Sequence, residues 1–182
     1  MRAVEAVKTI EVPDGVQVTI NGRMVSVKGE KGELTRDFSG SPVGLQLEDK
    51  KIIVQANWPR KKEAALVGTV TAIIQNMIKG VTKGFTYKLK IVFSHFPIGV
   101  KVKGDKVSIE NFTGERSPRF TKIMGAVKVS VKEDDVIVYG ISLEDVSQTA
   151  ANIERATKVK NKDPRVFLDG VFIYDKKEGM EL

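Results

Sequence analysis

Basic side chains gather in two stretches of this 182-residue chain that hold almost no acidic residues. The stretch from Ala64 to Gly104 has no aspartate or glutamate, yet it contains Lys79, Lys83, Lys88, Lys90, Lys101 and Lys103. A second cluster, interrupted after its first member only by Asp163, consists of Arg155, Lys158, Lys160, Lys162 and Arg165. Because lysine and arginine neutralise phosphates, these stretches and the net charge of +7 favour a polyanionic partner. The alternative is that each is a solvated face of the protein.

Residues for catalysis or metal binding are sparse. His95 is the only histidine and the chain has no cysteine, so neither a metal site of several histidines nor a thiolate metal site can be assembled, and we interpret His95 as structural rather than catalytic. The carboxylates of Glu133–Asp135 lie in a predicted turn, and the glycine-rich stretch Lys28–Gly32 lacks the spacing of a phosphate-binding loop. We therefore predict a protein that is not an enzyme and has no catalytic residues, metal, cofactor or small-molecule substrate.

Composition points to a cytoplasmic protein without a membrane partner. Hydrophobic residues make up 41% of the chain, and no apolar run approaches the roughly 20 residues that cross a bilayer. The first residues, Met1–Glu5, lack the apolar core of a signal peptide. The absence of cysteine excludes a disulfide framework.

The chain contains an internal repeat. Three segments of the first half recur in the second at offsets of 84, 82 and 84: Pro13, Gly15, Val16 and Val18 as Pro97, Gly99, Val100 and Val102; Val25–Val27 as Val107–Ile109; and Lys51–Val54 as Asp135–Val138. A repeat of this length indicates two copies of one small domain.

Each copy is predicted to contain a β-hairpin. A loop at Asn21-Gly22 sets Val18 opposite Val25, and a loop at Gly104-Asp105 sets Val102 opposite Val107. With these loops, the change of offset from 84 to 82 means that the first hairpin is longer by one residue on each strand.

Each copy is predicted to contain a helix after its strands. Apolar side chains at helical spacing run from Leu66 to Val81, and Ser142 with Asp145 resembles a capping box before a second helix that ends near Ala156. The sequence thus predicts an α+β fold with two tandem domains, residues 1–83 and 84–182. Each is an antiparallel sheet packed against a helix, and the second carries a C-terminal tail that holds the second basic cluster.

Two segments carry a family resemblance. Val27–Leu34 resembles the glycine-rich hairpin of the sixth large-subunit ribosomal protein family, and Val159–Phe172 resembles the C-terminal signature of its archaeal and eukaryotic branch. The spacing of Arg165, Phe167, Asp169 and Gly170 is the specific part, and the likeness covers nearly the whole chain.

The resemblance implies a structural protein of the large ribosomal subunit, present in the cytoplasm as part of the ribosome. It would bind large-subunit ribosomal RNA mainly through the second domain, near the sarcin-ricin loop and the base of the stalk, beside neighbouring ribosomal proteins. Arg165 is the best candidate for a bidentate contact with a phosphate. We predict RNA contacts at twelve basic residues: Lys88, Lys90, Lys101, Lys103, Arg116, Arg119, Lys122, Arg155, Lys158, Lys160, Lys162 and Arg165.

One observation and two alternatives oppose this interpretation. The half up to Ile91 carries a net charge of +6 and the remainder +1, so the summed charge favours the first domain. A duplicated DNA-bending protein of the TATA-binding type would need apolar wedges at matched positions, whereas Phe85, Phe93, Phe96 and Phe112 have no aromatic counterparts in the first copy. A protein-only module using a sheet edge would leave the acid-free stretch unexplained.

Overall fold

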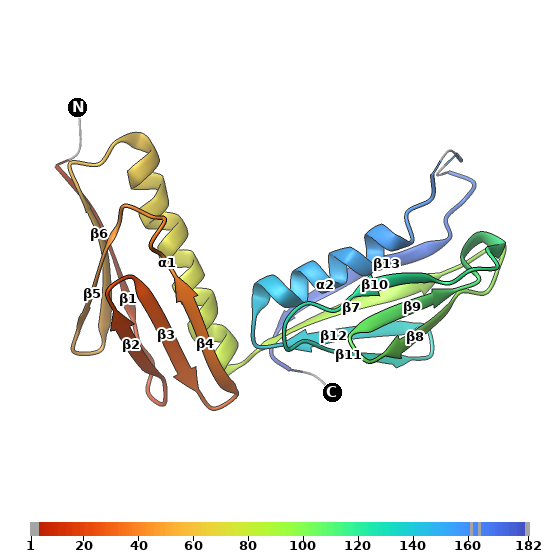
Figure 1. Cartoon of the computed structure of the whole chain (residues 1–182), viewed down its shortest axis with the longest axis horizontal. Coiled ribbons are helices and arrows are strands. Elements are labelled where there is room, and N and C mark those ends of the chain that lie inside the picture. Colours follow the sequence, from red (N-terminus) through yellow and green to blue (C-terminus); the bar gives the residue numbers. More distant parts are fainter. Residues whose placement is uncertain (1–3, 161, 164, 181–182) are drawn as a thin grey trace. The chain divides into compact units, whose positions relative to one another are not determined.

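The computed structural model describes residues 4–160, 162–163 and 165–180 (Figure 1). Contacts divide the chain into two compact units, Met1–Lys83 and Gly84–Leu182. Each unit combines antiparallel sheets with one long helix, which confirms the predicted α+β fold.

The first unit contains two three-stranded sheets and one helix. One sheet has the order β1-β6-β5 and the other the order β2-β3-β4. The helix α1 contacts strands of both sheets (Figure 1). The elements are β1 (Glu5–Glu11), β2 (Gln17–Asn21), β3 (Met24–Gly29), β4 (Gly32–Asp37), β5 (Gly44–Glu48), β6 (Lys51–Asn57) and α1 (Lys61–Thr82).

The second unit has a four-stranded sheet of order β11-β12-β7-β13 and a three-stranded sheet of order β10-β9-β8. Helix α2 contacts β7, β12 and β13 of the larger sheet (Figure 1). The elements are β7 (Phe85–Val92), β8 (Gly99–Lys103), β9 (Lys106–Glu110), the short 3-10 turn η1 (Phe112–Gly114), β10 (Arg119–Lys122), β11 (Lys128–Lys132), β12 (Asp135–Gly140), α2 (Leu143–Ala156) and β13 (Gly170–Glu178).

The register of the first hairpin corrects the prediction. The two-residue loop is Gly22-Arg23, with Asn21 opposite Met24, so Val18 faces Val27 and not Val25. Gly22 has φ +63°, which a left-handed loop position requires and glycine supplies without strain. The register differs by two residues, so the same side chains still share a face.

The second hairpin forms as predicted, with Val102 opposite Val107. When the two hairpin tips are matched, Val18 corresponds to Val100, so the second strands also match at an offset of 82. The extra two residues of the first copy therefore precede the hairpin, and the expectation of one added residue on each strand is wrong.

Local caps set the helix ends. The backbone N–H of Arg60 donates to the Glu63 carboxylate at 2.7 Å, and α1 begins at the next residue. The Ser142 hydroxyl accepts the N–H of Asp145 at 3.3 Å, as the sequence pattern predicts. Gly84 follows α1 with φ +78°, a conformation that ends a helix at low cost.

Each unit buries its own core. The buried apolar side chains of the first unit all lie between Ile10 and Val81, and those of the second between Phe85 and Val171. The two clusters share no residue. Helix α1 is long and apolar enough to cross a membrane by length and composition, but Val67, Ile74 and Val81 are buried in the core of its own unit.

Candidate nucleic-acid interface

The tail that carries the basic cluster is attached to the second unit at both ends. Its N-terminal end is Thr157, directly after α2. The buried Thr157 hydroxyl donates to the Glu154 carbonyl at 3.0 Å and accepts the N–H of Val171 at 2.9 Å. This side chain therefore links the end of α2 to the start of β13, the two elements between which the tail lies in the sequence.

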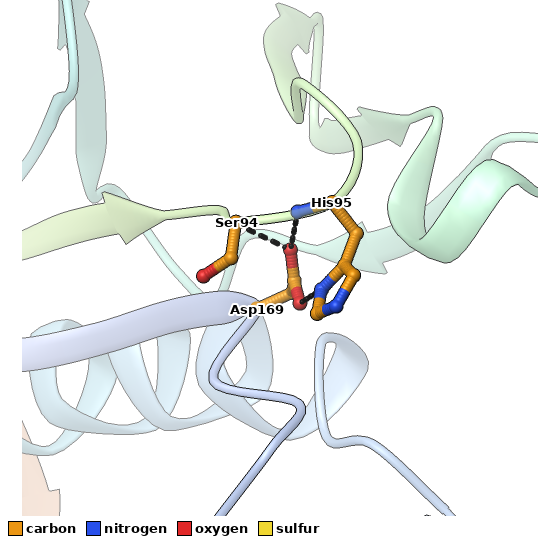
Figure 2. A network of polar contacts seen from close by, with 3 residues as sticks. All are labelled: Ser94, His95 and Asp169. Atoms are coloured by element: carbon orange, nitrogen blue, oxygen red, sulfur yellow. Dashed lines mark hydrogen bonds and ion pairs between the residues drawn. The ribbon is translucent and has the colours of Figure 1, made fainter.

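The second anchor is Asp169, which Figure 2 shows beside Ser94 and His95. Asp169 is 2% exposed. Its Oδ1 accepts the backbone N–H groups of Ser94 at 2.7 Å and His95 at 3.1 Å, and its Oδ2 lies 2.8 Å from Nδ1 of His95. Burial raises the pKa of Asp169, but the hydrogen bonds from Ser94 and His95 outweigh it, so that the pKa falls to about 2. The carboxylate is thus ionised and satisfied at neutral pH.

Phe167 packs the tail against the loop that follows β7. Its ring is stacked on the His95 ring, with centroids 4.8 Å apart and an interplanar angle of 24°. The ammonium of Lys162 lies 4.3 Å from the centroid of Phe167. These contacts hold the middle of the tail against His95, and one of the predicted RNA-binding lysines is placed by an aromatic ring.

The tail folds into a compact turn around Asp163. The Asp163 carboxylate accepts the N–H of Arg165 at 2.9 Å, and its backbone carbonyl accepts the N–H groups of Val166 and Phe167 at 3.1 and 3.0 Å. The Arg165 side chain is 92% exposed, and its Nε lies 4.0 Å from Asp163. The sequence predicts that Asp163-Pro164 restricts the backbone before Arg165. Pro164 lies outside the described residues, so this stays a prediction.

The exposed cations of this region lie on one continuous piece of chain. Arg155 is in the last turn of α2, and Lys158, Lys160 and Lys162 follow it. Within the described part of the chain, none of these four forms an ion pair with a carboxylate. The structure therefore brings together the predicted tail cluster as a set of solvent-facing positive charges. We call Arg155, Lys158, Lys160, Lys162 and Arg165 the tail cluster.

Other predicted RNA-binding residues have acidic partners. Lys101 lies 2.6 Å and Lys103 3.8 Å from the Glu110 carboxylate, on the hairpin of β8 and β9. Lys90 on β7 lies 3.3 Å from Asp135. These ion pairs are partly exposed and contribute little to stability, but they reduce the positive charge that each lysine presents.

Arg119 makes the most extensive contacts of the predicted set. Its guanidinium donates to both oxygens of Glu115 at 2.8 and 2.5 Å and to the Ala156 carbonyl at 2.7 Å, and it lies 4.3 Å from the centroid of Phe112. The Ala156 contact satisfies a carbonyl at the end of α2. Arg119 thus supports the point from which the tail departs.

The remaining predicted residues are spread over the second unit. Lys88 is half-buried in the middle of β7, Lys122 is exposed at the end of β10, and Arg116 is exposed between η1 and β10. The structure does not gather them with the tail cluster into one described site. Their contact with RNA stays a prediction.

Sequence reasoning missed Asp169 and Thr157, the two side chains that hold the tail. His95 is correctly interpreted as structural, but its partner is 74 residues away, and neither spacing nor periodicity reveals such a pair. The only signal is the position of Asp169 inside the family-like segment. Among the described residues, no group of three or more metal-ligating side chains is found.

Comparison with known proteins identifies the family. The family model for ribosomal protein L6 matches residues 12–84 and 96–170, one match for each copy of the repeat. The large ribosomal subunit protein uL6 of Aeropyrum pernix is 55% identical over 174 residues, which cover 95% of this chain and 96% of the relative. The uL6 of Desulfurococcus amylolyticus is 50% identical over 182 residues, 98% of this chain and 99% of the relative.

A third relative, uL6 of Methanothrix thermoacetophila, is 48% identical over 95% of this chain and 98% of its own length. These matches confirm both the family resemblance of the two sequence segments and the tandem duplication. The chain belongs to the ribosomal protein L6 family, whose members are structural components of the ribosome and not enzymes.

Proposed function

We propose that this chain binds large-subunit ribosomal RNA mainly through its second domain, with the tail cluster making the principal phosphate contacts. From the family resemblance we also propose where the chain binds: near the sarcin-ricin loop and the base of the stalk, in contact with neighbouring ribosomal proteins. The protein would work in the cytoplasm as part of the ribosome and take no small-molecule substrate or cofactor.

The observation that carries the proposal is the contrast between four members of the tail cluster and three lysines of the sheets. Lys90, Lys101 and Lys103 each lie within 4 Å of a carboxylate, whereas Lys158 and Lys160 project from the tail without one among the described residues. Because phosphate binding depends on charge within about 8–10 Å, local clustering outweighs the larger net charge of the first domain.

The tail is suited to phosphates because contacts within the second unit already hold several of its described residues in place. Thr157 and Asp169 hold its two ends, and the Asp163 turn shapes its middle. Binding therefore costs less conformational entropy than ordering a free tail would. The cations also follow the C-terminal end of α2, where the helix dipole favours positive charge.

Recognition of this kind neutralises phosphates without reading sequence. Folded RNA would be selected through the shape of its backbone and its 2′-hydroxyl groups, which a pre-shaped row of cations can match. Arg165, with a 92% exposed side chain, is the residue whose guanidinium can contact two oxygens of one phosphate.

The test compares two charge-matched variants of the full chain. In one, Lys158, Lys160, Lys162 and Arg165 are replaced with alanine. In the other, Lys8, Arg60, Lys61 and Lys62 of the first domain are replaced likewise. Affinity for a large-subunit ribosomal RNA fragment that includes the sarcin-ricin loop should fall at least about tenfold in the tail variant and much less in the control. An equal loss, or a greater loss in the control, would refute the assignment.

A further inference from the structure

A groove of about 720 Å³ lies where the end of α2, the tail and the start of β13 meet. Its lining residues include the apolar Phe167, Leu168 and Phe172, together with Arg155, Lys158 and Glu154. An apolar groove bordered by cations lies directly beside the tail cluster. A contact made only through phosphates would not use this apolar surface.

The apolar wall of the groove is exposed and held in place. Phe172 is 45% exposed and Leu168 is 54% exposed. The Phe172 ring lies over Gly170, where a Cβ atom would meet its Cζ at 2.9 Å. The glycine therefore lets the ring rest against the backbone at the start of β13. A ring fixed in this way loses little freedom when a flat group packs on it.

The charges of the groove favour an anion at its rim. Arg155 and Lys158 form no ion pair within the described part of the chain. Of the two lining carboxylates, Asp169 is buried and accepts the hydrogen bonds of the Ser94–His95 loop, and Glu154 is partly buried and accepts the N–H of Ile173 at 3.3 Å. Because Arg155 and Lys158 are exposed, the most accessible charges at the groove are positive.

We propose that this groove receives one unpaired nucleotide of RNA, with its base against Phe172 and Leu168 and its phosphate at Arg155 and Lys158. Within a double helix the bases are stacked and paired, so only a bulged, looped or terminal nucleotide can place its base on a protein side chain. The inference rests on the proposed RNA binding and adds a contact with a base, which that proposal does not require. An apolar side chain of a protein partner would leave Arg155 and Lys158 without a counter-charge. We therefore favour a nucleotide over a protein side chain as the occupant.

The experiment uses the full chain with three RNA probes. They are a short oligouridylate, an oligomer of equal length in which the bases are absent, and a perfect RNA duplex. Phe172→Ala should weaken oligouridylate binding by about tenfold, since base stacking on an aromatic ring has an effect of this size. Binding of the abasic oligomer and of the duplex should not change. The matched control is Phe120→Ala, which removes a phenylalanine that is 56% exposed on β10 and does not line the groove.

A second variant keeps the test valid if removal of the Phe172 ring disturbs the fold. Trp58 is the only tryptophan, so Phe172→Trp combined with Trp58→Phe places a single fluorescent ring in the groove. Oligouridylate should quench its fluorescence, and the abasic oligomer at equal occupancy should not. Absence of quenching, or equal effects of Phe172→Ala and Phe120→Ala on oligouridylate, would overturn the proposal.

The outcomes also separate this inference from the proposed function. If the variant lacking Lys158, Lys160, Lys162 and Arg165 loses duplex affinity while Phe172→Ala behaves like its control, phosphate binding stands and the base contact is wrong. If Phe172→Ala leaves all three RNA probes unaffected but weakens retention on large-subunit particles, a protein occupies the groove, and the inference is again overturned.

Discussion

The carboxylate of Asp169 holds both the backbone and the side chain of His95: Oδ1 accepts the His95 N–H at 3.1 Å, and Oδ2 lies 2.8 Å from its Nδ1 (Figure 2). This pair joins the loop after β7 to the end of the tail, 74 residues further along the chain. Because Phe167 stacks on the same imidazole, one buried carboxylate holds both the end of the tail and the ring against which Phe167 packs.

Replacing Asp169 with alanine should destabilise the second domain by about 2–4 kcal/mol, because the N–H groups of Ser94 and His95 lose their acceptor in a partly buried site. Asp169→Asn, which keeps an acceptor oxygen, should cost less, about 1 kcal/mol. Urea unfolding followed by far-ultraviolet circular dichroism measures both changes. Asp134→Ala, at an exposed position in the turn between β11 and β12, is the control. Equal stability of Asp169→Ala and Asp134→Ala would contradict the role of the carboxylate.

Acid should remove the contribution of Asp169 to stability. Its pKa of about 2 is below the ordinary value of 3.8, so the unfolded chain takes up the proton first as the pH falls. The stabilisation is therefore complete above about pH 4, declines between about pH 4 and 2, and corresponds to about 2 kcal/mol. The free-energy difference between the native protein and Asp169→Ala should shrink over this interval. A difference that is constant down to pH 2 would show that the carboxylate is not held by these hydrogen bonds.

The fragment Gly84–Leu182 should fold without the first domain, because every residue of its buried core lies between Phe85 and Val171. We expect cooperative urea unfolding by circular dichroism and protected amides in β7 and α2. In the full chain, the fluorescence of Trp58 reports only on the first domain and provides an independent signal. Non-cooperative melting of the fragment, without protected amides, would contradict the two-domain organisation.

Binding to ribosomal RNA should weaken steeply with salt. Each phosphate neutralised contributes about 0.7–0.9 to the slope of log affinity against log salt concentration. The variant without Lys158, Lys160, Lys162 and Arg165 should therefore show a slope shallower by about 3. Filter binding across a range of potassium chloride concentrations measures it, with the first-domain variant as reference. A slope that is unchanged in the tail variant would place the phosphate contacts elsewhere.

Local patterns in the sequence predict most of the secondary structure. The hairpin loop at Gly104-Asp105, the helical spacing up to Val81 and the serine cap at Ser142 each depend on neighbours within a few residues. The repeat adds the prediction of two domains of one kind. The register of the first hairpin could not be predicted in this way, because Asn21-Gly22 and Gly22-Arg23 are both acceptable loops. The pairing of β3 with β4 involves residues outside the turn.

The tail cluster itself is visible in the sequence, since Lys158, Lys160, Lys162 and Arg165 need no partner to be recognised as a concentration of charge. Tertiary structure decides which cations have carboxylate neighbours. Lys101 meets Glu110 only because β8 and β9 pair in one register. Tertiary structure also decides that Asp169 contacts His95 and that Phe172 borders a groove. Contacts between distant segments depend on the packing of α2 and β7 in one core, and no local pattern encodes that packing.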